Sequence, residues 1–243
     1  MEIFYIAIAF ALGGILKGAT GAGAPLIAVP LLALFYDVPT AVAVFVIPNL
    51  LPNLYQAWQH RESRMPPLLA WPFAIGGGLG VIPGTFMLAR LSTDTLTLVV
   101  SLAVFAYIGF RLARPDWVLG ARMGTRLAGP AGVVGGILQG AAGLSAPVSI
   151  TFINAMKPPR EAFIATISLF FATLGAVQLP LLVHYGLLDW TRFAQSCLAL
   201  VPLVAFMPVG AFLARFISRA VFDRVILVML SLIALRLFYG AVT

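Results

Sequence analysis

Charged residues are scarce in this sequence of 243 residues. It has 15 Lys or Arg and 8 Asp or Glu, so that 9% of the residues are charged and 61% are hydrophobic. Soluble globular domains carry roughly 25% charged and 45–50% apolar residues. A water-facing surface needs more charge than this, so the composition excludes a soluble globular protein. The apolar stretches are continuous rather than alternating, which predicts an all-α integral membrane protein.

The residues that catalysis or metal binding needs are also few. Cys197 is the single cysteine, which excludes an intramolecular disulfide, a thiolate zinc site and an iron–sulfur cluster. The two histidines, His60 and His184, are far apart in the sequence, and no two carboxylates have metal-binding or acid–base spacing. We therefore expect no catalytic residue, no metal and no cofactor. The absence of a carboxylate inside the apolar segments also argues against a proton relay.

Six apolar segments have lengths close to the roughly 17–25 residues that a membrane-spanning helix needs. The predicted spans are Thr40–Trp58, Leu68–Ala89, Leu96–Leu112, Ala162–Val183, Phe193–Ala214 and Val225–Tyr239. Four further apolar segments are too short to span comfortably: Ile3–Leu16, Pro25–Tyr36, Ala131–Leu138 and Pro147–Ala155. Glycine-rich breaks, Gly18–Ala24 and Gly140–Ala146, join them in pairs. Since unpaired backbone enters a membrane only where protein or a cavity surrounds it, each pair is predicted to be a hairpin whose tip lies within the membrane.

The sequence contains an internal repeat. Gly13–Pro25 (GGILKGATGAGAP) matches Gly135–Pro147 (GGILQGAAGLSAP) at a shift of 122, with nine of the thirteen positions identical. Further along the shift becomes 125, so that Pro83 corresponds to Pro208 and Arg90 to Arg215. The repeat predicts two homologous halves, 1–113 and 130–243, joined by a cytoplasmic linker at 114–129.

Each half contains one hairpin and three spans, an odd number of crossings, so the two halves should have opposite orientations in the membrane. The basic residues agree, because this topology places most of them on one side, which the positive-inside rule assigns to the cytoplasm. Both termini are then extracytoplasmic, in a multi-pass protein of the plasma (inner) membrane. The net charge of +7 is accounted for by this bias, and we expect no nucleic-acid partner. The residues on the basic side are Arg61, Arg64, Arg111, Arg114, Arg122, Arg126, Lys157, Arg160, Arg215, Arg219 and Arg224.

The two glycine-rich breaks are the candidate substrate site. Transporters with inverted repeats bind their substrates near the midplane, where broken helices meet. Pro25 and Pro147 each suit the first turn of a new helix, whose free N–H groups favour an anion. The alternative is that the glycines serve close helix packing. The candidates at the breaks are Gly18, Thr20, Gly21, Gly23, Gly140, Gly143 and Ser145; the two hydroxyls could donate to an anion or bond back to their own helix.

Lys17 directly precedes the first break and is the only lysine within a predicted membrane segment. Since a cation at the bilayer centre costs about 2.5–3.5 kcal/mol on insertion scales, Lys17 should face a cavity or a partner. The alternative is that it snorkels to the interface. Gln139 stands at the matching position of the second half, so the repeat is not chemically symmetric there.

A row of amide side chains lies on one predicted helix. Asn49, Asn53 and Gln56 have the spacing of one helical face, and Gln178 matches Gln56 in the second half. Amides are costly against lipid, so this face should point into the protein. Substrate contact and structural hydrogen bonds between helices explain these residues equally well.

The duplicated glycine-rich hairpins ending in proline, Gly18–Pro25 and Gly140–Pro147, together with the Pro83 and Pro208 region, resemble the TauE/SafE family of sulfite and organosulfonate exporters. The resemblance covers essentially the whole chain. It implies the movement of small sulfur-containing anions, such as sulfite or short-chain sulfonates, and no enzymatic activity. The named substrate comes from the resemblance alone.

The sequence thus predicts a secondary transporter that alternates access around a midplane anion site formed by the two breaks. Its partners are a small anionic substrate and the lipid bilayer. A passive anion channel is an alternative that the sequence does not separate from a carrier, and an intramembrane enzyme is a weaker one because clustered His, Asp or Glu residues are lacking. The coupling ion, the direction of transport and a homodimer stay open, because no segment marks a coupling site or an interface.

Overall fold

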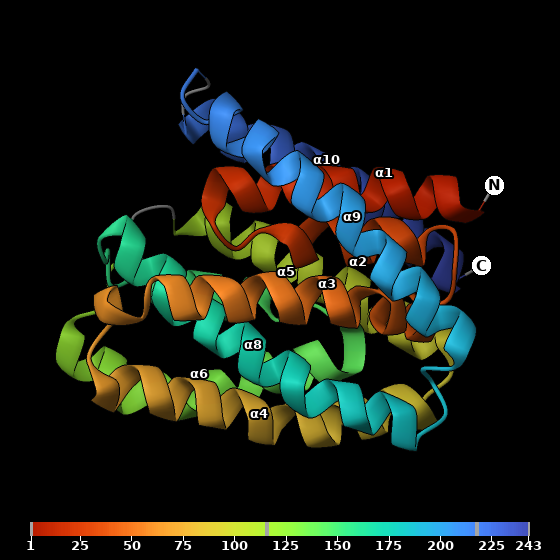
Figure 1. Cartoon of the computed structure of the whole chain (residues 1–243), viewed down its shortest axis with the longest axis horizontal. Helices are drawn as coiled ribbons and strands as arrows, with labels where there is room; N and C mark the ends of the chain where they lie inside the picture. Colours follow the sequence, from red (N-terminus) through yellow and green to blue (C-terminus); the bar gives the residue numbers. More distant parts are fainter. Residues whose placement is uncertain (1, 115–116, 217–218, 243) are drawn as a thin grey trace.

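The computed structural model describes residues 2–114, 117–216 and 219–242, and it is built of α-helices with no strand in those residues. The all-α membrane fold expected from the composition is confirmed. The elements, shown in Figure 1, are α1 (Glu2–Thr20), α2 (Ala24–Ala33), α3 (Val38–Gln59), the 3-10 turn η1 (Arg61–Ser63), α4 (Pro67–Arg90), α5 (Thr93–Ala113), α6 (Ala121–Ala142), α7 (Ala146–Asn154), α8 (Arg160–His184), α9 (Trp190–Leu213) and α10 (Arg219–Val242).

Local chemistry sets where several helices begin. The side chains of Asp37 and Asp189 each accept a hydrogen bond of 2.7 Å from a backbone N–H in the first turn, of α3 and α9 respectively. Ser92 does the same at the start of α5. These side chains satisfy N–H groups that have no partner inside the helix. Two of the chain's few carboxylates are therefore helix caps at the ends of the bundle.

Six helices in the described residues are long and apolar enough to cross a membrane. Five of them confirm predicted spans, in α3, α4, α5, α8 and α9. The sixth is Ile3–Thr20, which contains the segment Ile3–Leu16 that the sequence predicts to be too short to span. The predicted span Val225–Tyr239 lies within α10, a helix of 24 residues, whose described apolar part is Leu227–Ala241. The prediction that Ala131–Leu138 is a short helix is wrong, because this segment belongs to α6, a continuous helix of 22 residues. Because α6 begins at Ala121, much of the expected linker at 114–129 is helical; residues 115 and 116 lie outside the described residues.

Glycines keep α1 and α6 continuous because they meet other helices at close range. A Cβ on Gly18 would overlap the backbone carbonyl of Met207 in α9, and one on Gly14 would overlap that of Leu203. Likewise, a Cβ on Gly136 would overlap the carbonyl of Gly77 in α4. Such close packing of backbones compensates for the low helix propensity of glycine in a membrane. The packing interpretation of these glycines is therefore the one that the helix geometry supports.

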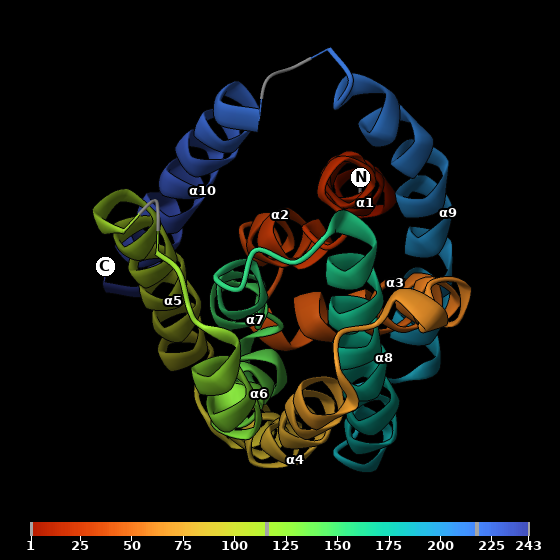
Figure 2. The same cartoon turned by 90° about the vertical axis from the view of Figure 1, so that its left-hand side faces the viewer.

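Every major contact between long helices joins the two halves of the sequence. α1 packs along α9, α4 along α6, α3 along α8 and α5 along α10. By the shifts of 122 and 125, α1 corresponds to α6, α3 to α8, α4 to α9 and α5 to α10. Exchanging corresponding helices turns the pair α1–α9 into the pair α6–α4 and leaves the pairs α3–α8 and α5–α10 unchanged. Figure 2 shows the short helices α2 and α7 inside a ring of longer ones. The halves are thus interleaved rather than separate domains.

The equivalent helices α3 and α8 lie antiparallel. Gln56 in α3 contacts Ser168 in α8, whereas Asn49, two turns earlier in α3, contacts the later residue Phe171. Gly175, later still in α8, packs against Leu50. An antiparallel arrangement is what two halves of opposite orientation would give, so this contact supports the predicted inversion.

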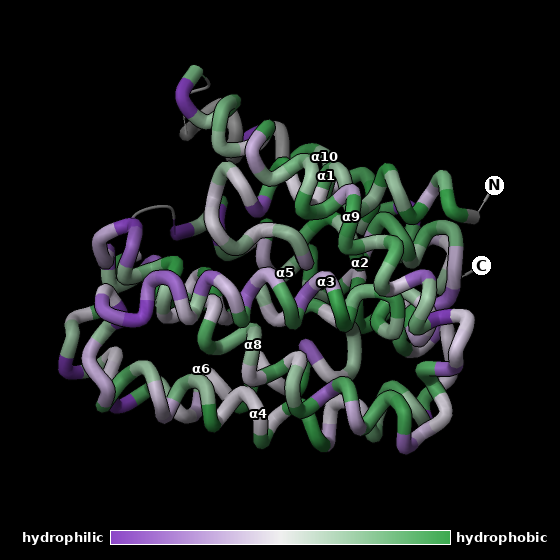
Figure 3. The backbone as a smooth tube through the Cα atoms, in the orientation of Figure 1, coloured by the Kyte–Doolittle hydropathy of each residue, from purple (hydrophilic) through white to green (hydrophobic). Residues whose placement is uncertain are grey.

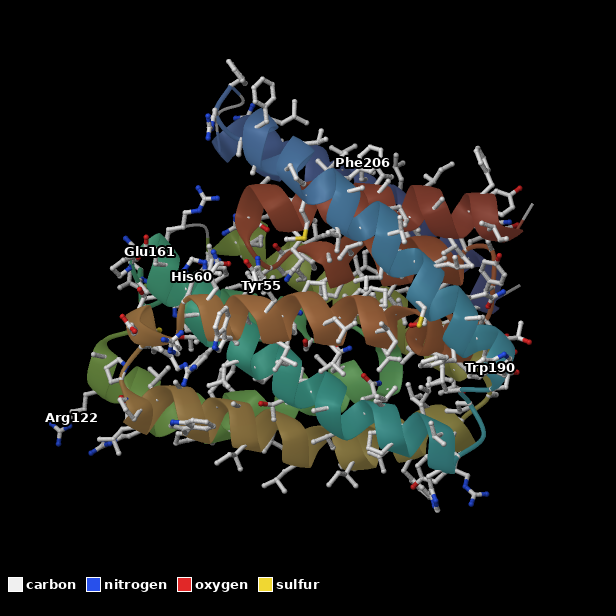
Figure 4. The ribbon with its side chains drawn as sticks, in the orientation of Figure 1. Tyr55, His60, Arg122, Glu161, Trp190 and Phe206 are labelled. Atoms are coloured by element: carbon white, nitrogen blue, oxygen red, sulfur yellow. The ribbon has the colours of Figure 1, made fainter. Side chains whose placement is uncertain are left out.

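The polar residues gather at the two ends of the bundle, and apolar residues cover its length (Figure 3). Both termini lie at the same end in Figure 1. In Figure 4, His60, Arg122 and Glu161 lie at the opposite end from Trp190. Large apolar side chains are exposed along the outer helices, Leu79 on α4 and Val201 on α9 among them. This distribution is that of a protein whose sides face lipid and whose ends face water.

Candidate functional site

The first break places a lysine in the interior of the protein. Lys17, in the last turn of α1, is only 2% exposed. Its Nζ donates a 2.6 Å hydrogen bond to Oδ1 of Asn53 in α3. Burial excludes the snorkelling alternative for this lysine in the structure. The partner is a neutral amide, and in the described residues Lys17 forms no ion pair with a carboxylate.

The amide row on α3 orients that partner. Nδ2 of Asn53 donates to the backbone oxygen of Asn49 at 2.6 Å and to its Oδ1 at 3.2 Å. Nδ2 of Asn49 in turn donates to the backbone oxygen of Phe171 in α8 at 3.4 Å. These bonds turn the oxygen of Asn53 towards Lys17. The predicted common face is therefore inside the protein, and its two asparagines are used to hold the lysine.

The turn between α1 and α2 is satisfied locally. Gly21 has φ = 89°, a conformation that favours glycine. Oγ1 of Thr20 donates back to the carbonyl of Leu16 at 2.8 Å and accepts from the N–H groups of Ala22 and Gly23 at 3.3 and 3.1 Å. Of the two alternatives for this hydroxyl, the structure has it bonded to its own helix. Pro25 supplies no N–H, so the start of α2 offers an anion few donors.

The second break has the same backbone but different side-chain chemistry. Gly143 has φ = 67° and ends α6 in the left-handed conformation. Oε1 of Gln139 accepts from the Oγ of Ser145 at 3.1 Å and from its N–H at 3.4 Å. Nε2 of Gln139 donates to Oε1 of Gln178 at 3.4 Å, and Nε2 of Gln178 donates to the Gln139 carbonyl at 3.2 Å. The three side chains form a buried neutral network.

The glycines of the two turns contact equivalent residues. A Cβ on Gly21 would crowd Ile164 in α8, and one on Gly143 would crowd Val42 in α3. Ile164 and Val42 are themselves related by the shift of 122. The turn of the first half therefore packs against α8 of the second half, and the turn of the second half packs against α3 of the first half.

Some predicted site residues lie outside these two groups of side chains. Gly18 and Gly140 pack against the backbones of α9 and α4, respectively. Gln56 bonds to Ser168, its Oε1 accepting from Oγ at 3.3 Å, rather than to Lys17 or the break. Gly23 is buried, and a Cβ there would overlap Leu16. These residues shape the surroundings of the breaks without being brought together with Lys17.

Thr85 in α4 is a buried polar residue that the sequence pattern does not reveal. It is fully buried at 0% exposure, and its Oγ1 is one of the few buried side-chain atoms in the described residues without a hydrogen-bond partner. Its backbone lies against Gly140, beside the second break. An unpaired buried hydroxyl calls for an explanation such as an unseen partner. A single threonine in an apolar helix gives no pattern that could have revealed it.

The buried polar side chains are of types that hydrogen-bond a ligand. In the described part of the chain, no three His, Cys, Asp or Glu residues are grouped so that they could hold a metal. The buried polar residues there are one lysine and eleven neutral side chains. The buried polar residues are Lys17, Asn49, Asn53, Thr85, Ser101, Gln139, Ser145, Ser149, Thr166, Ser168, Gln178 and Ser196. An ammonium group among hydroxyls and amides can attract and hydrogen-bond an anion.

The long apolar helices and the exposed apolar side chains along them define a multi-pass helical membrane protein. The chain belongs to the sulfite exporter TauE/SafE family, whose family model matches residues 5–237, nearly its whole length. It is therefore a membrane transporter for a small sulfur-containing anion and not an enzyme, as the resemblance implied. No curated protein and no solved structure matches the chain.

Proposed function

We propose that the chain is a secondary carrier that exports sulfite or short-chain organosulfonates and binds them at Lys17. The observation that carries this proposal is the geometry of Lys17, which is 2% exposed, is bonded to Asn53 at 2.6 Å and has no carboxylate partner among the described residues. A buried cation that lacks a counter-charge is unfavourable, because desolvation costs several kcal/mol per ion. An anionic substrate would supply that counter-charge.

The donors available for the anion belong to the lysine itself. An ammonium group has three N–H donors, and Asn53 accepts one of them. Hydrogen bonds from an ammonium to an oxyanion are about twice as strong as neutral ones. Asn53 and Asn49 act in this proposal as positioning residues, since their own bonds direct the amide oxygen towards Nζ.

Alternating access is proposed to arise from motion of one set of paired helices against the other. The apolar core has two groups: one runs through α1, α2, α3, α5, α9 and α10 with single residues from α4, α6, α7 and α8, and the other lies among α4, α6, α7 and α8. Each group combines helices from both halves of the sequence. The break at Gly21 packs against α8, and the break at Gly143 packs against α2 and α3, so that both breaks contact the two groups. Rocking of one group would open the breaks to one side at a time.

The proposed orientation has both termini extracytoplasmic in the inner membrane. It rests on the bias of basic residues towards the end of the bundle opposite the termini, where Arg122 lies and where His60 precedes Arg61 in the sequence. A homodimer remains a proposal from the size of the chain, to be tested by its mass in detergent.

Counterflow in proteoliposomes tests the proposed function. Vesicles containing the purified protein are loaded with unlabelled sulfite or isethionate, and labelled substrate is added outside. A carrier gives transient accumulation of label above equilibrium, driven by exchange. A passive anion channel gives only monotonic equilibration, and protein-dependent uptake that never exceeds equilibrium would contradict the carrier proposal. No uptake of any sulfur-containing anion would contradict the substrate class.

A further inference from the structure

We infer that Lys17 is a proton-binding site linked to the anion: its side chain takes up a proton from solvent as the anion binds and returns it as the anion leaves. This inference deepens the proposed function and rests on it. Three observations lead to it: the burial of Lys17, the neutral partner of its Nζ, and the kinds of side chain that surround it.

The empty site surrounds Lys17 with neutral groups. The side chain is 2% exposed, and its Nζ donates to the amide oxygen of Asn53 at 2.6 Å. Asn49, the next side chain of the amide row, bonds to Asn53 and to the backbone of Phe171. An ammonium and a neutral amine both have N–H groups, so either form can make the bond to Asn53. Of the two, only the ammonium bears the cost of a buried charge without a counter-charge.

The helices that pack against α1 bring no counter-charge to Lys17. These helices are α2 and α9. α2 contains no ionisable side chain, and those of α9 are Arg192 and Cys197, near its start. α9 meets the end of α1 much later in its course, where Met207 lies against Gly18. The ionisable groups of α9 are therefore distant from the lysine along that helix.

α3 and its neighbour α8 bring none either. On α3, Tyr55 is 60% exposed. The guanidinium of Arg64 donates to the carbonyl of Ala57, one turn after Asn53, and as a further cation it adds no counter-charge. The remaining ionisable side chains lie at the ends of α3 and α8 and are exposed or partly exposed: Asp37, His60, Arg160, Glu161, His184 and Tyr185. Within the described buried set, Lys17 is thus the one side chain that can exchange a proton near neutral pH, since the others are amides and hydroxyls.

An anion beside Nζ changes this balance. Its negative charge supplies the missing counter-charge, whether the anion carries one charge or two, and an ammonium makes stronger hydrogen bonds to it than an amine does. The occupied site therefore holds the proton more firmly than the empty site. The proton adds to the lone pair of Nζ as a new N–H bond, and the anion keeps all of its own bonds. Because linkage is reciprocal, the proton strengthens anion binding by the same factor.

Calorimetry of isethionate binding to the detergent-purified protein tests the inference. Isethionate is the anion of a strong acid, so a proton taken up on binding goes to the protein. Titrations at a series of pH values from neutral upwards, each in two buffers of different ionisation heat, count the protons. We expect uptake that rises towards about one proton per anion, with an affinity that falls by up to about tenfold per pH unit. Binding without proton uptake at every pH would overturn the inference and leave the carrier proposal intact. Failure of both isethionate and sulfite to bind would overturn the proposed function itself.

Matched variants assign the proton to this lysine. A guanidinium keeps its proton at any accessible pH, so Lys17→Arg should bind isethionate without proton uptake and without the pH dependence. Lys17→Gln should also take up no proton with whatever affinity it retains. Lys157→Gln changes the only other lysine, and His60→Gln and His184→Gln change the two histidines; all three should keep the wild-type proton count. Wild-type uptake in folded Lys17→Arg, or loss of uptake in either histidine variant, would overturn the inference. The wild-type count decides the matter if neither Lys17 variant folds.

Discussion

The two helix breaks share a backbone and differ in chemistry. Both contain a glycine with positive φ, Gly21 and Gly143, followed by a proline at the start of a short helix. At the first, a lysine is held by amides and has donors left over; at the second, a glutamine, a serine and a glutamine satisfy one another. The comparison teaches that two turns of the same backbone conformation can differ in chemistry, because among the described buried residues only the first has a lysine beside it. Each of the following changes would break or sharpen that difference.

The largest expected effect comes from putting a lysine into the second break. Gln139→Lys would bury a second ammonium among neutral side chains, because the partners of residue 139, Gln178 and Ser145, supply no counter-charge. We expect the free energy of unfolding to fall by about 3–5 kcal/mol, the cost typical of an uncompensated buried charge. Thermal unfolding in detergent measures it, with Gln139→Met as the uncharged control. A lysine variant as stable as the methionine variant would contradict the difference between the breaks.

Removing the lysine from the first break is expected to act on binding rather than on stability. Lys17→Gln loses a charged hydrogen-bond donor, worth about 1.5–3 kcal/mol, so sulfonate affinity should fall by about 10- to 100-fold. Stability should change little, because a desolvated ammonium is removed together with its bond. Isothermal titration and thermal unfolding on the same preparation separate the two effects. Lower stability with unchanged affinity would give Lys17 a structural role only.

Changing Asn53, the partner of Lys17, should affect sulfonate affinity less than removing the lysine does. The direction of the effect should depend on the residue that replaces Asn53. Asn53→Ala removes the acceptor at 2.6 Å from Nζ and leaves the lysine unpositioned, at a cost of about 1–3 kcal/mol in stability. Asn53→Asp instead offers Lys17 a permanent carboxylate, which should compete with the anion. We therefore expect the aspartate variant to bind sulfonate more weakly than the alanine variant. The reverse order in titration would show that Asn53 does not control the charge at the site.

The smallest expected effect is a change that makes the second turn resemble the first. Ser145→Gly introduces the residue found at position 23 and removes the 3.1 Å bond to Gln139. We expect a loss of about 0.5–1.5 kcal/mol in stability, the usual value for a neutral hydrogen bond. Anion affinity should change less than it does in Lys17→Gln. A larger effect on affinity at Ser145 than at Lys17 would reverse the assignment of roles to the two breaks.

The long apolar runs made most of the fold predictable. The predicted bounds of five spans agree with the helices, because a run of about 20 apolar residues has one stable form in a membrane. The lengths of α1 and α6 were not predictable, because a glycine such as Gly18 breaks or continues a helix according to what it meets. The residue that it meets, Met207, is distant in the sequence. Propensity alone could not supply that contact.

The candidate site was predictable in its residue types and not in its bonds. Spacing placed Asn49 and Asn53 on one face, and the cost of a membrane cation required a partner for Lys17. The choice of Asn53 as that partner depends on how α1 and α3 approach one another. The hydrogen bond between Gln139 and Gln178 likewise depends on how α8 packs against α6, which the sequence does not reveal. The sequence already showed that the repeat is not chemically symmetric at Lys17 and Gln139, and the hydrogen bonds of the two side chains show how the breaks differ.

The measurement that tests the central claim most directly is counterflow of isethionate in proteoliposomes containing wild type, Lys17→Gln or Lys157→Gln protein at equal amounts. If the first break binds the anion through its buried lysine, wild type and Lys157→Gln will accumulate label above equilibrium and Lys17→Gln will not. Counterflow by Lys17→Gln at the wild-type rate would contradict the claim.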